Sequence, residues 1–561
     1  MINSSSTGDP AEHYGVNTLR PLTRTSSRES IQWARQRIEH CTNNHDCGRI
    51  LNTSPDTTQQ LIHPIRLVDV RMIDRSQVRL VSIEAASQYA TLSYCWGTNP
   101  DPPWVTTTSN MVSRHVGFST HILPQTLRDA ITLTRELGYD YLWIDALCIL
   151  QGDDSIDWEQ QTSQMGLIYG NSCITIAPSA PMSAESGIFN VESVDQSHEI
   201  PAVIDITTRT ADGQESTLHV FEWTGHTTRE EEESPKELRE DALSQRGWVY
   251  QERLFSPRTL HYTSNQLFWE CRKHYLAEDG LYTQPFTEGS AEGYPVAGRL
   301  RQLAKRGPGQ LTFNTTWKWY TSIVPDYTRR HLSRPADKLP ALSAVAKLIH
   351  DYTGAKYHAG LWLDAIQFGL CWSVTGPATR PAECRSPSYS WAAVDGVIQW
   401  SFPIFDNPPP ADFVVVAQHI SSQSRDPFGA VDSGRLQLYG QLKPAVIRAV
   451  VGDESDPLNY SNGELWETND AVDRMWRLGG MYPPKVILDE PEIGSYIEVQ
   501  CFLLCSTQPE LPGDRYWESY MLLLRPADKT KNFRRVGIAV LSEDNRAHWI
   551  GSSSRQQINL V

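Results

Sequence analysis

Apolar residues in the first half of the chain recur with two alternating periods, that of a strand and that of a helix. Residues 65–97 alternate in strand fashion and end in the string 89–97, Tyr-Ala-Thr-Leu-Ser-Tyr-Cys-Trp-Gly. After a polar loop at 98–123, a helix is predicted to begin near Pro124 and to stop at Gly138. Its apolar positions fit helical spacing: Leu127, Ala130, Ile131 and Leu137.

Two continuous apolar runs, 141–144 and 173–177, are typical of buried parallel strands. A single helix is predicted between them, starting near Ser155 or Asp157 and reaching Tyr169. The alternation of strands and helices predicts an α/β fold with a parallel sheet and right-handed crossovers.

Composition divides the rest of the chain. Residues 1–28 are predicted to be a disordered leader, and they lack the apolar stretch of a secretory signal. Residues 29–64 are predicted to hold a short helix at 31–38 and a Cys/His cluster, and residues 65–275 the α/β domain. A Gly/Pro-rich linker (276–312), a helical segment (313–380) and a mostly β C-terminal region (381–561) are predicted to follow.

The net charge and the cysteine usage limit the classes of partner and the cellular compartment that we expect. The net charge of −16 disfavours nucleic acid or an anionic membrane surface as the main partner. No apolar run is long enough for a membrane span, so none is expected. The ten cysteines lie mostly inside apolar runs, which is typical of reduced thiols and indicates a cytoplasmic protein.

The carboxyl ends of the predicted strands are the expected binding rim, because ligands of open α/β sheets bind there. The residues at or just after these strand ends are Ser93, Tyr94, Trp96, Gly97, Asp145, Cys148 and Ser179. Asp145 follows four apolar residues, so its carboxylate either caps a neighbouring loop or faces a ligand. Cys148 lacks a visible activating base, and a buried structural thiol is expected.

Two further clusters leave alternatives open. The polar and aromatic string 246–253 either forms a salt-bridged helix docked by its aromatics, or brings Glu252 and Arg253 to the rim to bind a polar or phosphorylated ligand. The four side chains His40, Cys41, His45 and Cys47 could hold zinc. Their compressed spacing and the lack of a second pair in register argue against it, so no metal is expected. The chain has no Walker A loop, GxGxxG, HExxH or GxSxG.

Together the motifs resemble the fungal heterokaryon incompatibility (HET) family. The motifs that carry this resemblance are segments 89–97, 123–130 (LPQTLRDA), 137–151 (LGYDYLWIDALCILQ), 157–158, 186–189 and 246–254 (RGWVYQERL). Segments 327–346, 360–362 and 386–391 resemble later landmarks of such proteins. The resemblance identifies 65–275 as the HET domain.

The resemblance implies nonself recognition after hyphal fusion, with cell death of incompatible partners. A distant similarity of the family to TIR domains implies a flavodoxin-like core, self-association, and cleavage of NAD by a carboxylate. NAD would then be a substrate, and no cofactor is expected. An acidic residue of the family pattern is replaced here by Gln161, so either Asp145, Glu159 or Glu252 takes its role or this copy is catalytically weak.

The implied ligand-binding residues are Ser93, Tyr94, Trp96, Gly97, Cys148, Gln151, Trp158, Gln161, Arg246, Trp248, Gln251 and Arg253. Three functions stay open: a cell-death effector that associates with itself and with another incompatibility protein, a biosynthetic enzyme acting on a small molecule, and a non-catalytic scaffold.

Overall fold

The structure is a computed structural model that divides into two compact units, Met1–Arg301 and Gln302–Val561. It describes residues 2–4, 28–48, 64–83, 87–99, 102–152, 155–189, 204–220, 238, 240–264, 266–278, 283–285, 312–400, 410–422, 424–449, 463–467, 476–477, 485–490, 496–507, 518–542, 549 and 553–561. Most of the predicted leader and linker lies outside these residues. None of the described helices is long and apolar enough to cross a membrane.

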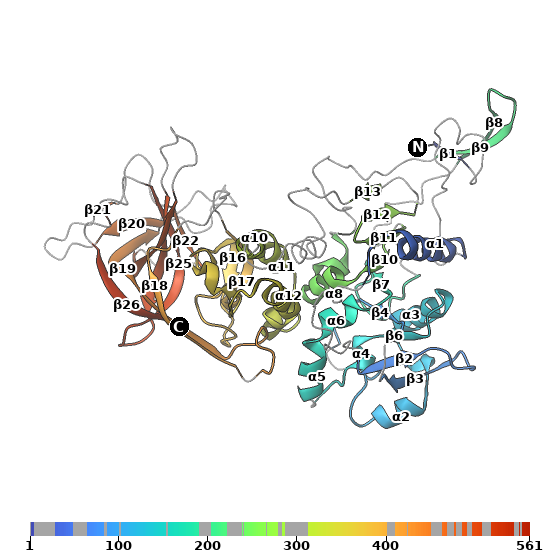
Figure 1. The fold of residues 1–561 in the computed structure, drawn as a ribbon, viewed down its shortest axis with the longest axis horizontal. Coiled ribbons are helices and arrows are strands. Elements are labelled where there is room, and N and C mark those ends of the chain that lie inside the picture. Colours follow the sequence, from blue (N-terminus) through green and yellow to red (C-terminus); the bar gives the residue numbers. More distant parts are fainter. Residues whose placement is uncertain are drawn as a thin grey trace. The chain divides into compact units, whose positions relative to one another are not determined.

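Unit 1 is built on one large sheet (Figure 1), in which ten described strands take part. In sheet order they are β13 (Thr283–Pro285), β12 (His274–Ala277), β11 (Leu267–Cys271), β10 (Arg258–Tyr262), β7 (Ile174–Pro178), β4 (Ala90–Leu92), β6 (Tyr141–Trp143), β2 (Arg66–Asp69), β3 (Gln77–Ser82) and β5 (Phe118–Ser119).

The centre of this sheet is parallel. Strand β4 pairs in parallel with β6 on one side and with β7 on the other, and β7 pairs in parallel with β10. Numbered along the chain, these four strands lie in the order second, first, third, fourth, as in flavodoxin-type sheets. The predicted α/β class is confirmed. The whole sheet is mixed, because antiparallel strands extend the parallel centre at both sides.

The helices of unit 1 lie on both faces of the large sheet (Figure 1). They are α1 (Arg28–Asn44), α2 (Met111–Val116), α3 (Gln125–Glu136), α4 (Asp145–Cys148), α5 (Ser155–Thr162), α6 (Met165–Gly170) and α8 (Gly247–Phe255). Helix α3 confirms the prediction from apolar spacing: Leu127, Ala130 and Ile131 are buried, and Gly138 follows with a φ of +86°. A small separate sheet contains β1 (Ile2–Ser4), β9 (Glu215–Val220) and β8 (Ile204–Arg209).

The single helix predicted from Ser155 to Tyr169 was wrong, because the chain forms α5 and α6 with a break at 163–164. The Thr162 hydroxyl donates to the carbonyl of Trp158 at 2.7 Å, and the Ser163 hydroxyl donates to the carbonyl of Gln160 at 3.0 Å. Such side-chain bonds compete with the helical ladder and favour its termination.

Unit 2 begins with helices, as predicted for 313–380, but the later part of that range also forms the short hairpin β14 (Tyr357–His358) and β15 (Leu361–Trp362) and the strand β16 (Ser373–Thr379). It contains α10 (Thr312–Lys318), a π-helical stretch (Trp319–Ile323), α11 (Val324–Thr328) and α12 (Ser343–Thr353). Two indoles, of Trp319 and Trp391, donate to the carbonyl of Gly360 at 3.0 and 2.8 Å. Gly360 has a φ of +86°, and a Cβ there would lie 2.7 Å from Nε1 of Trp391. The close approach therefore requires glycine at this position.

The rest of unit 2 is mostly β, as predicted. Strand β19 (Ser433–Ala449) pairs with both β23 (Tyr496–Thr507) and β26 (Ser554–Leu560). Strands β24 (Glu518–Pro526) and β25 (Asn532–Ser542) complete a closed ring, since β23 pairs with β24, β24 with β25, and β25 with β26. The ring is closed by two residue pairs between β25 and β26, so the first part of β26 pairs on one side only, with β19.

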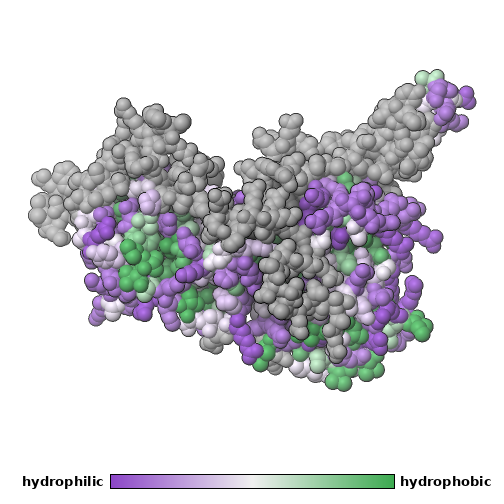
Figure 2. All heavy atoms as spheres, viewed as in Figure 1, coloured by the Kyte–Doolittle hydropathy of each residue, from purple (hydrophilic) through white to green (hydrophobic). Residues whose placement is uncertain are grey.

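Further strands extend unit 2: β16 (Ser373–Thr379), β17 (Asp395–Gln399), β18 (Val414–Ser421), β20 (Gly463–Glu467), β21 (Trp476–Arg477) and β22 (Lys485–Leu488). On β18 and β19, the side chains of Val414, Val416 and Tyr439 are exposed. Figure 2 shows apolar residues gathered on the visible face of the β-rich part of the molecule.

A buried arginine joins the strands of unit 2 to the segment that follows its helices. The Arg535 guanidinium is fully buried, donates to Asp489 at 3.0 Å and to the carbonyl of Leu370 at 2.6 Å, and stacks 3.3 Å from the Trp372 ring centroid. Its removal would leave the buried Asp489 carboxylate with less compensation.

We expect Arg535→Leu to lower the free energy of unfolding of unit 2 by about 3–5 kcal/mol, because one partner of a buried ion pair is lost. Urea unfolding followed by tryptophan fluorescence measures this loss. Arg534→Leu, at the exposed neighbouring position, is the control and should change stability by less than about 0.5 kcal/mol. Equal unfolding midpoints for the two variants would contradict the assigned role of Arg535.

Candidate functional site

The candidate site lies where the first and third parallel strands, β4 and β7, sit side by side. Chain connections leave these strands in opposite directions, which makes this the switch point of the sheet. A small hollow here is lined by Ser93, which follows β4, by Ser179, which follows β7, and by His261 of β10. Ser93 and Ser179 therefore lie together at the carboxyl ends of these strands, where the rim was expected.

Glu252 is the central side chain of the site. Helix α8 carries it back onto the end of β4, where the Ser93 hydroxyl donates to Oε2 of Glu252 at 2.5 Å. The Tyr169 hydroxyl from α6 lies 3.2 Å from the same oxygen and 3.0 Å from the carbonyl of Leu92. Burial raises the pKa of Glu252 to about 7, even though Arg246 and Ser93 favour its ionised form.

Asp145 is the second carboxylate of the site, placed by the turn from β6 into α4. It accepts from the indole of Trp96 at 2.8 Å and from the backbone N–H of Ala146 at 2.7 Å. Burial raises the pKa of Asp145, and its charge in turn helps to raise the pKa of Glu252. The two carboxylates are thus electrostatically coupled.

Arg246 supplies the positive charge. It stands at the N-terminal boundary of α8, and its guanidinium donates to the carbonyl of Tyr94. Its charge lowers the pKa of both Asp145 and Glu252, against the effect of burial. One guanidinium facing two carboxylates favours a site in which one carboxyl is protonated or a cationic group is bound.

Two buried amides lie on the helices of this site. Gln161 on α5 and Gln251 on α8 are both completely buried. Within the described part of the chain, neither oxygen nor nitrogen of either amide has a hydrogen-bond partner. The rings of Trp158 and Trp248 pack edge to face at 6.4 Å, which holds α5 against α8. Buried amides without partners carry a desolvation cost that a polar ligand would relieve.

Other residues proposed for the rim make local contacts. The Cys148 thiol is buried, which raises its pKa to about 12 and leaves it unreactive at neutral pH. The Gln151 amide donates to the carbonyl of Ile149 at 3.2 Å. Gly97 is exposed and has a φ of +96°, which explains the glycine of its motif. The Glu159 side chain on α5 is partly exposed.

Arg253 belongs to a second buried network, which reaches the hollow through His261 and Ser179. It donates to Glu270 and to the Tyr275 hydroxyl, each at 2.8 Å. Glu270 also lies 2.8 Å from Nε2 of His261, whose Nδ1 is 3.2 Å from the Ser179 hydroxyl. Glu270 and His261 lie outside the recognised motifs, so only the pairing of β10 with β11 reveals them.

Two acidic motif residues have structural contacts. Asp157 forms an ion pair with Arg66 at 2.5 Å and accepts from the backbone N–H of Leu150 at 2.8 Å. Asp129 on α3 accepts from the backbone N–H of Ile188 at 2.8 Å. Both carboxylates hold loops around the sheet and are satisfied by these contacts.

A second group of side chains lies elsewhere in unit 1. Cys41, His45, Cys47 and Cys271 place their potential ligand atoms within 4.8 Å of one another. Three of the four belong to the Cys/His cluster of the sequence. His40 is not one of them, and Cys271 of β11 is the fourth member.

Comparison with known proteins supports the motif assignment. Residues 89–252 match the family model described as heterokaryon incompatibility protein (HET). Searches of curated proteins and of solved structures found no match. The matched segment begins at Tyr89, just before β4, and ends at Glu252, so it spans both sides of the Ser93–Glu252 hydrogen bond.

The raised pKa of Glu252 predicts a pH-dependent stability. A carboxyl whose pKa rises from 4.5 to about 7 on folding stabilises the protein while protonated, and this contribution is lost as the pH rises through about 7. Glu252→Gln does not titrate. Its melting temperature relative to wild type should therefore rise between about pH 5.5 and about pH 8.5, by the equivalent of roughly 2 kcal/mol.

Glu159→Gln is the matched control, because this side chain is partly exposed on α5. Its melting temperature should follow that of wild type across the same pH range. A constant difference between Glu252→Gln and wild type would show that Glu252 does not titrate in this way.

Proposed function

Because residues 89–252 form a domain of the heterokaryon incompatibility (HET) family, we propose that the chain is an effector of nonself recognition between fungal cells. Its partners would be further copies of itself and another incompatibility protein. The outcome would be death of the fused cell.

The observation that carries a chemical role is the buried carboxylate of Glu252 at the switch point of the sheet. Ser93 and Tyr169 fix its Oε2 by hydrogen bonds at 2.5 and 3.2 Å, so the group is held in one orientation. A fixed carboxylate in a low-dielectric site stabilises positive charge more strongly than it would in water.

NAD is the substrate we propose for this site. In the reaction, the bond between the nicotinamide nitrogen and the ribose C1′ breaks with both electrons leaving on nicotinamide. Water adds its oxygen to C1′, which gives nicotinamide, ADP-ribose and one proton. Ionised Glu252 would stabilise the positive charge that develops on the ribose ring.

The contacts of Asp145 and the neutral side chain of Gln161 both favour Glu252 as the residue that stabilises the charge on the ribose. Gln161 is neutral and cannot supply the charge that an acidic residue would at its position. Asp145 is held by Trp96 and by its own backbone neighbour, and its charge raises the pKa of Glu252. We therefore assign the direct role to Glu252 and an electrostatic role to Asp145.

Loss of NAD in the presence of purified full-length protein is the test. We expect nicotinamide release at a rate that rises with pH through about 7, because ionised Glu252 is the active form. Glu252→Gln should lower the rate by about 100-fold or more. Glu159→Gln should retain most of it, which separates the two candidate carboxylates.

Expression in a fungal host distinguishes the remaining functions. Growth arrest with loss of cellular NAD, both abolished by Glu252→Gln, supports the proposed effector. Arrest without NAD loss would leave an effector that acts by association alone. No arrest and no NAD loss from folded protein would overturn the proposal and favour an enzyme acting on another small molecule.

A further inference from the structure

We propose that Cys41, His45, Cys47 and Cys271 bind one zinc ion, which fastens the N-terminal helix α1 to strand β11. This site is separate from the carboxylate site and does not depend on the proposed function. No motif of the recognised HET segment contains any of its four residues.

The geometry of the four side chains fits tetrahedral zinc. All four potential ligand atoms lie within 4.8 Å of one another, and Nδ1 of His45 lies 3.6 Å from Sγ of Cys271. Zinc bonds of about 2.3 Å to sulfur and about 2.1 Å to nitrogen, at a tetrahedral angle, place these two atoms about 3.6 Å apart. The measured separation therefore matches one edge of the coordination tetrahedron.

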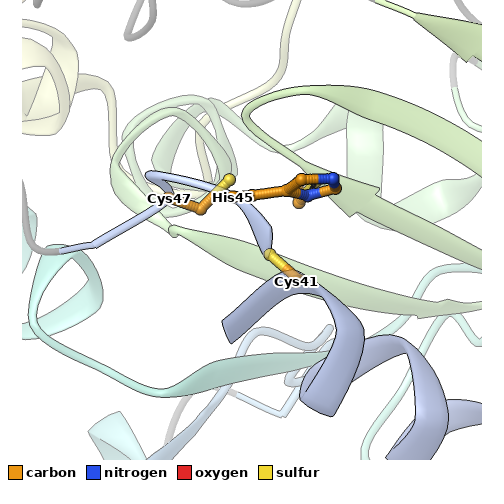
Figure 3. Close-up of side chains that lie close together, drawn as sticks. Cys41, His45 and Cys47 are labelled. Atoms are coloured by element: carbon orange, nitrogen blue, oxygen red, sulfur yellow. Dashed lines mark hydrogen bonds between the residues drawn. The ribbon is translucent and has the colours of Figure 1, made fainter. Parts of the chain in front are cut away.

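The ligands come from segments far apart in the sequence. Cys41 lies in the last turns of α1, and His45 and Cys47 lie in the short segment after it (Figure 3). Cys271 is the last residue of β11, 226 residues beyond His45. The backbone N–H of His45 donates to the carbonyl of Cys41 at 3.1 Å, which turns the chain so that both side chains reach the same place.

The donor set favours a structural zinc site. Three thiolates and one imidazole are a common ligand set for structural zinc, and four protein ligands leave no open position for a substrate. The three cysteines are buried and the histidine is partly buried, so bulk water has little access to the group. Soft thiolates also disfavour magnesium and calcium.

Neighbouring arginines balance the charge. Three thiolates around a divalent ion leave a net charge of −1, and Nε of Arg258 donates to Sγ of Cys41 at 3.3 Å. Arg272 donates to the carbonyl of Cys47 at 3.3 Å, which fixes the backbone of that ligand. Hydrogen bonds of this kind orient metal ligands and stabilise thiolate sulfur.

His40 belongs to the Cys/His cluster of the sequence but is not one of the proposed zinc ligands. It packs its ring against that of His45, with centroids 5.3 Å apart, and lies 3.3 Å from the side-chain amide of Asn44. It is absent from the group of converging ligand atoms. The two histidines are therefore a matched pair, of which only His45 should bind metal.

Metal content of the purified full-length chain is the first measurement. We expect about one zinc ion per chain by mass spectrometry of the metal after dialysis. Replacement of zinc by cobalt(II) should give the absorption of tetrahedral cobalt with thiolate charge-transfer bands. Removal of the metal by a strong chelator should lower the melting temperature of wild type by on the order of 10 °C.

His45→Ala and Cys271→Ser should reduce bound zinc to below about a tenth of the wild-type level, because a three-ligand site holds the ion weakly. His40→Ala and Cys95→Ser, a buried thiol outside the group, are the controls and should keep full occupancy. If the ligand variants do not fold, the zinc content of the wild-type protein is by itself the test of the proposal.

Three results would overturn the proposal. The first is folded wild-type protein that takes up no zinc even when zinc chloride is added. The second is a disulfide between two of the three cysteines, found by peptide mapping without reductant. The third is full zinc occupancy in both His45→Ala and Cys271→Ser.

Discussion

The hydrogen bond between Ser93 and Glu252 is the contact on which the arrangement of the candidate site depends. It joins the end of β4, the first of the central parallel strands, to α8, which leads into β10, the last of them, across 159 residues. Tyr169 adds a contact from α6 to the same oxygen. A single buried carboxylate thus fixes two helices against one strand end, and the same burial gives it an unusual affinity for protons.

Buried charge is used repeatedly to join segments that are distant in sequence. Arg66 reaches Asp157, Arg253 reaches Glu270, and Arg535 reaches Asp489. Each pair is supplemented by hydrogen bonds to backbone or hydroxyl groups, which is the condition under which burial of an ion pair is tolerated. Within each unit, these ion pairs add directional contacts to the packing of the apolar core.

Much of the central fold could be predicted, because its information is local. Periodicity located α3, β6 and β7, and the strand-end rule placed Ser93 and Asp145 at the rim. The break between α5 and α6 was missed, since it arises from hydroxyls that bond backwards along the helix.

The pairings that could not be predicted depend on strand register. Cys271 could be matched with Cys41, and His261 with Glu270, only once β10 and β11 were paired and placed. The antiparallel extensions of the sheet were missed for the same reason.

The sheet of unit 1 is larger than the segment that the family model covers. Strand β2 pairs with β6 from before residue 89, and β10 pairs with β7 from after residue 252. A fragment cut at the limits of the match would expose both flanks of its parallel centre as bare edges, which invite pairing between molecules. The unit that recombination could move intact between proteins is therefore the whole sheet with its flanking strands, and the matched segment alone would make a poor module for exchange.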